Sequence, residues 1–251
     1  MTKKELYDIL VNDERAASFL ENDKYKKLYN YILSTYRSYK SDNVEPAELT
    51  HFLLSAGIDL FYEGDIFTMA FFNDKTLKTF DFSGIIDIGS LAFANSSIQS
   101  ANLNDVERIG IGAFQSSDLS KVTLRQGVDI DQNAFARCKF DTIYIPDGAT
   151  IATEAFYGCV GLKTVALDGE MISLKYHSFE DCRNIDTLFY HDGINEELLK
   201  YVFMYSEKKD IYLNVVPSAG ESINLNVIED HIRNDVLKFK KFNSITVKEV
   251  E

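Results

Sequence analysis

A phenylalanine that recurs at a near-constant interval is the feature that most constrains the fold of this chain. It follows alanine in most copies and serine in the last, and successive intervals are 22, 21, 21, 21 and 23 residues. The six dipeptides are Ala70-Phe71, Ala92-Phe93, Ala113-Phe114, Ala134-Phe135, Ala155-Phe156 and Ser178-Phe179. A repeat of this length predicts a solenoid, in which each unit packs on the next.

Other apolar positions keep the same phase. An aliphatic residue lies five positions before each phenylalanine, at Ile66, Ile88, Ile109, Ile130, Ile151 and Leu174. Downstream, apolar pairs such as Val165 and Leu167 are two residues apart, which is typical of a strand with one buried face. Each unit is therefore predicted to hold a short turn or helix with the phenylalanine, then a strand of about four or five residues.

These motifs resemble a known family. The segment from Ile151 to Leu167 (IATEAFYGCVGLKTVAL) and the Ile-Pro-Asp at 145–147 match the pattern of BspA-type leucine-rich repeats, and the resemblance covers roughly residues 62–191. It implies an α+β repeat fold, a leucine-rich-repeat solenoid with a parallel strand ladder, and no enzymatic activity. The layout, a helical segment before a few repeats, also resembles uncharacterised bacteriophage proteins.

Three regions are predicted along the chain. Residues 1–58 form an N-terminal helical cap, with helices expected over about 24–39 and 46–55. Residues 59–191 hold about six repeats. Residues 192–251 form degenerate repeats and a C-terminal cap, because Phe203 and Val236 continue the phase around an insertion at about 215–235.

Composition excludes several classes of function. The chain has 39 acidic and 26 basic side chains and a net charge of −13, whereas phosphate-mediated nucleic-acid binding needs a basic surface. No apolar run approaches the roughly 18 residues of a membrane span, and the first residues lack the apolar core of a signal peptide. We therefore expect a cytoplasmic protein with no membrane partner.

The sequence offers little catalytic chemistry. Cys138, Cys159 and Cys182 each lie three residues after a repeat phenylalanine, so they are predicted to stack as buried, reduced fillers rather than to bind metal. The four histidines are scattered, and no nucleotide, nucleophile or metal motif is present. We expect no catalytic residues, no cofactor and no metal.

The outward positions of the strands are the candidate binding site. Along the C-terminal half of the ladder, Tyr144, Phe189 and Tyr212 are predicted to lie along one side with Ala166 between them. The full candidate set is Thr142, Tyr144, Thr164, Ala166, Thr187, Phe189, Asp210 and Tyr212. One alternative is that residues 215–235 cover Phe189 and Tyr212; the tyrosine-rich helix near Tyr29 would then be the next candidate.

The leading hypothesis is a non-enzymatic module that binds another protein. The layout favours a phage-encoded inhibitor that occludes or sequesters a host protein of an immune system. A structural or adhesive repeat protein of a surface or virion is the first alternative, and an acidic mimic of nucleic acid is the second.

Overall fold

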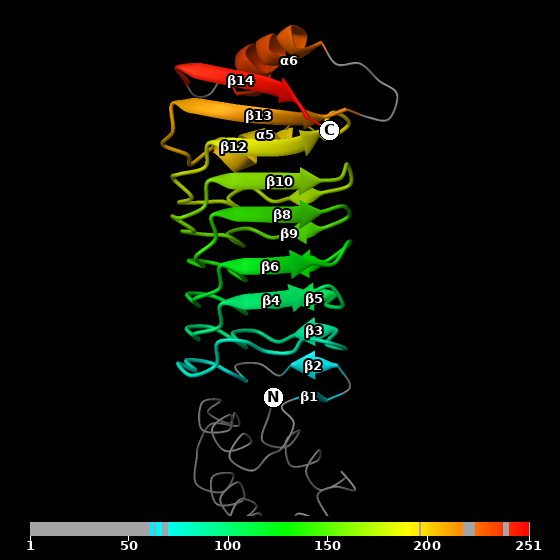
Figure 1. Cartoon of the computed structure of the whole chain (residues 1–251), viewed down its shortest axis with the longest axis vertical. Coiled ribbons are helices and arrows are strands. Elements are labelled where there is room, and N and C mark those ends of the chain that lie inside the picture. The colour runs from blue at the N-terminus through cyan, green and yellow to red at the C-terminus, as the bar shows by residue number, and fades with distance from the viewer. Residues whose placement is uncertain are drawn as a thin grey trace, which may run out of the picture.

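The computed structural model describes residues 61–62, 64–66, 70–195, 197–217, 224–237 and 241–250. The helical cap predicted for residues 1–58, with its tyrosine-rich helix, lies outside these residues. Figure 1 shows the described strands stacked along the longest axis, from β1 (Phe61–Tyr62) at one end to β14 (Ser244–Glu249) at the other. The stack is a parallel-strand solenoid, as the repeat predicts.

The predicted strands form the main ladder. It consists of β4 (Ser100–Leu103), β6 (Lys121–Leu124), β8 (Thr142–Pro146), β10 (Thr164–Asp168), β12 (Thr187–His191), β13 (Asp210–Val216) and β14 (Ser244–Glu249). β4 pairs with β6, and the other five strands form one sheet in the order β8-β10-β12-β13-β14. Every pair is parallel. In the first repeat the apolar pair of the predicted strand is Phe80 and Phe82; no strand forms there, although Phe82 is buried in the core.

A second ladder of two-residue strands runs alongside the first. Its members are β2 (Asp65–Ile66), β3 (Asp87–Ile88), β5 (Arg108–Ile109), β7 (Asp129–Ile130), β9 (Thr150–Ile151) and β11 (Ser173–Leu174), and β1 (Phe61–Tyr62) pairs antiparallel with β2. In each of the six parallel strands of this ladder, the second residue is the repeated aliphatic residue, and its side chain is buried. The predicted positions are therefore core positions, but the strands that carry them were not predicted.

The repeated phenylalanines stack as a column of rings inside the solenoid. Neighbouring rings from Phe71 to Phe179 have centroids 4.8–5.4 Å apart and interplanar angles of 4–12°. The segment that carries each ring from Phe93 to Phe179 is a turn, because residues two before and two after the phenylalanine have positive φ, such as Asn133 and Arg137 around Phe135 (both 58°). From Phe71 to Phe156, the N–H of each repeat phenylalanine donates to the next turn, as from Phe114 to the Ala134 oxygen at 2.7 Å.

The C-terminal turns keep the phase but replace the phenylalanine turn with helices. Phe203 ends helix α5 (Glu197–Phe203) and is buried. Helix α6 (Leu225–His231) and the π-helical segment η1 (Ile232–Val236) precede β14 and occupy the expected insertion. Ile245 of β14 pairs with Ile211 of β13, so the last strand extends the main ladder.

The predicted register between β12 and β13 is wrong by two residues. Tyr212 was expected beside Phe189 and Asp210 beside Thr187, but Tyr212 pairs with Thr187, and Phe189 pairs with Asn214. Asp210 pairs with Ser244 of β14. Helix α5 lies between these strands, and a helix advances about 1.5 Å per residue against about 3.3 Å in a strand, so this turn needs more residues. A shift of two keeps each side chain on its predicted face.

Candidate binding face

The outward side chains of β8, β10, β12 and β13 form what we call the strand face. Inward residues alternate with them, and Ile143, Val165, Leu188 and Ile211 are all buried in the core. Alternation of this kind turns every second side chain of a strand away from the core. The candidate residues Thr142, Tyr144, Thr164, Ala166, Thr187, Phe189, Asp210 and Tyr212 all occupy such outward positions.

Three aromatic side chains on this face are open to solvent. The exposed fractions are 65% for Tyr144, 46% for Tyr212 and 37% for Phe189. The alternative prediction was that residues 215–235 cover Phe189 and Tyr212. The exposed fractions of these two side chains show that the described part of that segment leaves both accessible. The strand face therefore meets the accessibility that a binding surface requires.

Register places the outward residues in rows across the strands. The first row is Thr142, Thr164, Thr187 and Tyr212, and the second is Tyr144, Ala166, Phe189 and Asn214. Tyr144 and Phe189 thus share a row with Ala166 between them, whereas Tyr212 lies in the neighbouring row. The structure brings together two of the three predicted aromatics and sets the third diagonally from Phe189.

Ala166 occupies an outward position but has little contact with solvent. Its exposed fraction is 6%, although its neighbours Val165 and Leu167 are the inward residues of β10. A methyl group that points out of a sheet becomes hidden when larger side chains stand on both sides of it. Ala166 is therefore the low point of the row, between the Tyr144 and Phe189 side chains.

A third row contains functional candidates that the sequence reading missed. Pro146, Asp168, His191 and Val216 follow the second row along the same strands. The Asp168 Oδ1 atom lies 3.5 Å from His191 Nε2, and 74% of the Asp168 side chain is exposed. Asp168 and His191 directly follow the inward residues Leu167 and Tyr190. The alternation that identified Ala166 and Phe189 as outward residues would have identified these two as well, had the predicted strands been extended by one residue.

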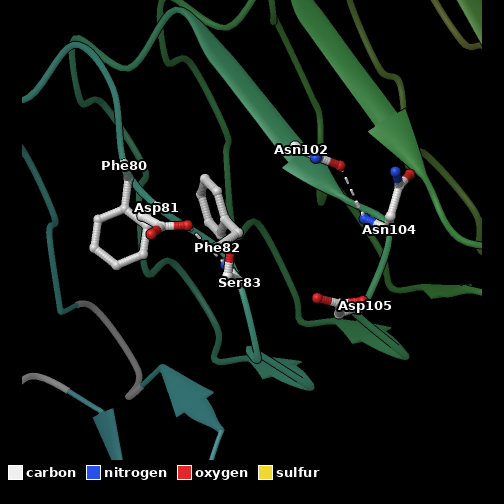
Figure 2. Close-up of a pocket in the computed structure, with 7 residues that line it drawn as sticks. All are labelled: Phe80, Asp81, Phe82, Ser83, Asn102, Asn104 and Asp105. Carbon is white, nitrogen blue, oxygen red and sulfur yellow. Dashed lines mark hydrogen bonds between the residues drawn. The ribbon is translucent and has the colours of Figure 1, made fainter.

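A small polar pocket lies at the other end of the main ladder. Figure 2 shows its lining, and its volume is about 90 Å³. The lining residues are Phe80, Asp81, Phe82, Ser83, Asn102, Asn104 and Asp105.

Hydrogen bonds of the turns occupy the polar side chains of this pocket. Asp81 Oδ1 accepts from the Ser83 N–H at 3.0 Å, and Asp105 Oδ2 accepts from the Gly84 N–H at 3.2 Å. Hydrogen bonds from the Ser83 side chain and backbone lower the pKa of Asp81. A carboxylate held ionised in this way stabilises a turn and is a poor general acid.

Charged side chains line the outer side of the two-residue strands. Arg108 Nη2 lies 2.8 Å from Asp87 Oδ2, and Arg108 is also in register with Asp129. Burial and the negative charge of Asp129 raise the pKa of Asp131. The arrangement is an ion cluster in which Arg108 partly compensates stacked carboxylates.

The three cysteines are buried and free, as predicted. Each thiol donates to the phenylalanine carbonyl oxygen of the preceding turn, at 3.1–3.2 Å. Burial raises the pKa of Cys138 to about 12. The pKa of Cys182 is also raised, mainly by its contact with the Cys159 side chain and secondly by burial. Redox and metal chemistry use the thiolate, which the surroundings of Cys138 and Cys182 disfavour. The described residues contain no group of three or more His, Cys, Asp or Glu side chains placed to hold a metal ion.

Comparisons with known proteins identify the repeat. The family model described as "BspA type Leucine rich repeat region" matches residues 64–150 and 128–246, with six copies. Comparison with curated proteins and with solved structures finds no match. Among the residues that the structure describes, no helix has the length and apolar composition needed to cross a membrane.

Proposed function

Since the chain belongs to the BspA-type leucine-rich repeat family, we propose that it is a non-enzymatic module that binds a partner protein through its strand face. The observation that carries the proposal is the exposure of Tyr144, Phe189 and Tyr212 on one rigid sheet. Aromatic side chains are over-represented among the residues that dominate binding energy at interfaces. A sheet already fixed by its ladder loses little conformational entropy when a partner binds.

The surroundings of the aromatics also support an interface. Thr142, Thr164 and Thr187 form the adjoining row, and their short polar side chains can donate and accept hydrogen bonds. An apolar centre with a polar margin is the usual anatomy of a protein–protein interface. Catalysis would instead need acids and bases that converge in a cleft, and the shifted carboxyl groups described above belong to turns and ion pairs.

We further propose that the partner is a host protein of an immune system and that the module is a phage-encoded inhibitor acting in the cytoplasm. This step rests on the layout predicted from the sequence, a helical segment followed by a short run of repeats. An adhesive or structural role on a surface or virion also suits the family, and it differs in requiring self-association or attachment to a surface. The strand face holds more threonine and aromatic side chains than carboxylates, so we do not favour a nucleic-acid mimic.

The test is affinity capture from a host lysate with three immobilised proteins: the parent chain, the Tyr144→Ala/Phe189→Ala double variant, and Ser100→Ala as the control. Ser100 is exposed in β4, on the polar half of the main ladder. We expect the parent and Ser100→Ala to capture the same protein, identified by mass spectrometry, and the double variant to lose it. Equal capture by all three proteins would remove the strand face as the binding site.

A further inference from the structure

One pair of neighbouring strands in the main ladder is not joined. β4 and β6 form one sheet and β8 begins the next, so β6 and β8 follow each other along the solenoid without pairing. Figure 1 shows their two arrows farther apart than those of β8 and β10. Both strands lie within residues 70–195, which the structure describes without a break. We call the unpaired stretch between residues 121–124 and 142–145 the ladder gap.

The phase of the repeat would allow these two strands to pair. The phenylalanines of their two turns are 21 residues apart, and so are those of the turns that carry β4 and β6, which do pair. The same phase would set Val122 beside Ile143 and Thr123 beside Tyr144. A difference of register therefore does not explain the ladder gap.

Hydrogen bonds and packing close the solenoid on every other side of the ladder gap. The Lys139 N–H donates to the Leu119 oxygen at 2.8 Å just before the two strands, and the Gly127 N–H donates to the Asp147 oxygen at 2.9 Å just after them. Behind the gap, β5 pairs with β7, and the rings of the two turns stack with centroids 5.4 Å apart. The ladder gap is thus a local opening in one side of the solenoid.

The inward side chains of β6 are left partly uncovered by this opening. Val122 and Leu124 are only half-buried, whereas the inward residues of β4 and β8 are buried. The Thr123 hydroxyl donates to Asn102 Oδ1 of β4 at 2.7 Å, so this outward side chain leans away from β8. Pairing of β6 with β8 would cover the two apolar side chains and satisfy the backbone groups that face the gap.

Phe140 distinguishes the unit of β8 from its neighbours. It occupies the buried position two residues before the strand, where the units of β4, β6, β10 and β12 have Ile98, Leu119, Leu162 and Ile185. The Phe140 ring lies edge-on to Phe135 of its own turn at 5.8 Å and to Phe156 of the next turn at 6.4 Å. Its additional volume therefore packs toward the β10 side, and a close-packed core has little room to absorb it without a shift of the strands.

We infer that the ladder gap is a conformational joint, where the main ladder closes by pairing β6 with β8 and opens again, and that Phe140 favours the open form. In the closed form Thr123 lies beside Tyr144, whose side chain is 65% exposed in the open form. The joint thereby controls how far Tyr144 is accessible at the edge of the strand face. This behaviour is a property of the chain alone and needs no partner.

The experiment follows amide hydrogen exchange of the whole chain by mass spectrometry of peptic fragments. Exchange under native conditions proceeds through local openings, so its rate reports how easily each strand opens. We expect residues 119–126 and 140–147 to exchange faster than residues 162–169 and 185–192, because β10 and β12 are paired on both sides and β6 and β8 on one. Equal protection of the four segments would overturn the joint.

Phe140→Leu tests what holds the joint open. Leucine is the residue that the two adjacent units have at this position, so the variant should close the ladder gap and slow exchange of residues 119–126 and 140–147 about tenfold. Residues 185–192 of the same sample are the internal reference, because a general loss of stability would speed their exchange as well. Ile185→Leu makes a conservative change at the equivalent position and should leave residues 119–126 unchanged.

The variants also give the results that would contradict the role of Phe140. If residues 119–126 of Phe140→Leu exchange as fast as those of the parent, relative to residues 185–192, the ring does not hold the ladder open. An equal slowing by Ile185→Leu would mean that the effect is not specific to the ladder gap. Phe140→Met removes the ring with less loss of volume and takes the place of Phe140→Leu if that variant does not fold.

Discussion

The thiol of Cys159 donates a hydrogen bond to the carbonyl oxygen of Phe135, across 3.2 Å and between successive turns of the solenoid. Cys138 and Cys182 make the same contact with Phe114 and Phe156. The stacked position continues with serine in other turns, where Ser96, Ser117 and Ser206 are also buried. A small side chain fits this buried position, and cysteine fills it with more apolar volume than serine; the buried Ser96 hydroxyl has no hydrogen-bond partner, whereas each cysteine thiol has one.

The first prediction concerns thiol reactivity. In the folded chain all three thiols should resist a thiol reagent such as dithionitrobenzoate, because each is buried and bonded to backbone. Adding denaturant should release three equivalents of thiol at the rate of unfolding, measured by absorbance. Stoichiometric labelling within seconds under native conditions would contradict the buried ladder.

The second prediction concerns alkaline pH. Burial raises the pKa of Cys138 from its ordinary value of about 9 to about 12, so the folded state favours the protonated thiol. This contribution to stability is complete below about pH 9 and is lost as pH rises toward 12, at up to roughly 1.4 kcal/mol per pH unit for each such thiol. Urea unfolding between about pH 9 and 11 measures the loss. Cys138→Ser should show a shallower decline than the parent, and parallel curves would show that the thiol does not contribute.

The third prediction concerns the column of rings. Phe135 lies between Phe114 and Phe156, with centroids 5.4 Å from both, and all three are fully buried. Phe135→Ala should lower the free energy of unfolding by about 3–5 kcal/mol, since it leaves a cavity and breaks two stacking contacts. Phe156→Ala should behave alike, as measured by urea or thermal denaturation. A melting temperature within a degree or two of the parent would mean that the repeat phase is misassigned.

The fourth prediction concerns the strand face. Tyr144→Ala, Phe189→Ala and Tyr212→Ala should each leave the fold intact because these side chains lie outside the core. Each should weaken binding of the captured partner, by about 2 kcal/mol or more for Phe189, which is central among the three. Titration calorimetry with the purified partner gives the affinities, and Ser100→Ala serves as the control. Unchanged affinity in all three aromatic variants would exclude this face.

The main ladder could be predicted because two signals coincide in it. The interval of the phenylalanines fixes the phase, and alternation such as that of Val165 and Leu167 fixes the buried face of each strand. The second ladder escaped prediction because a strand of two residues, such as Arg108–Ile109, is too short to show any alternation. These short strands pair because successive turns stack on each other, and this stacking leaves no pattern in the local sequence.

The outward positions of the strand face were predicted residue by residue, but their rows were not. The strand order and the outward positions follow from the repeat, whereas the pairing of Tyr212 with Thr187 depends on how many residues helix α5 uses to span one turn. Asp168 was missed because the expected strands ended at the inward pair. Register and strand ends depend on tertiary packing, which a single sequence specifies only weakly.

The parallel pairing of both ladders has a consequence for the history of this gene. The segment from Asp131 to Ile151 contains one complete copy of each ladder strand and one ring of the column. Duplication of such a segment would insert a new rung with compatible neighbours above and below, and would lengthen the protein by about 4.8 Å without altering either end. Intervals of 21 to 23 residues all keep the rings stacked in this chain, so a copy can vary by one or two residues without leaving the column. Selection on such a gene therefore adjusts the reach of the protein in steps of whole copies.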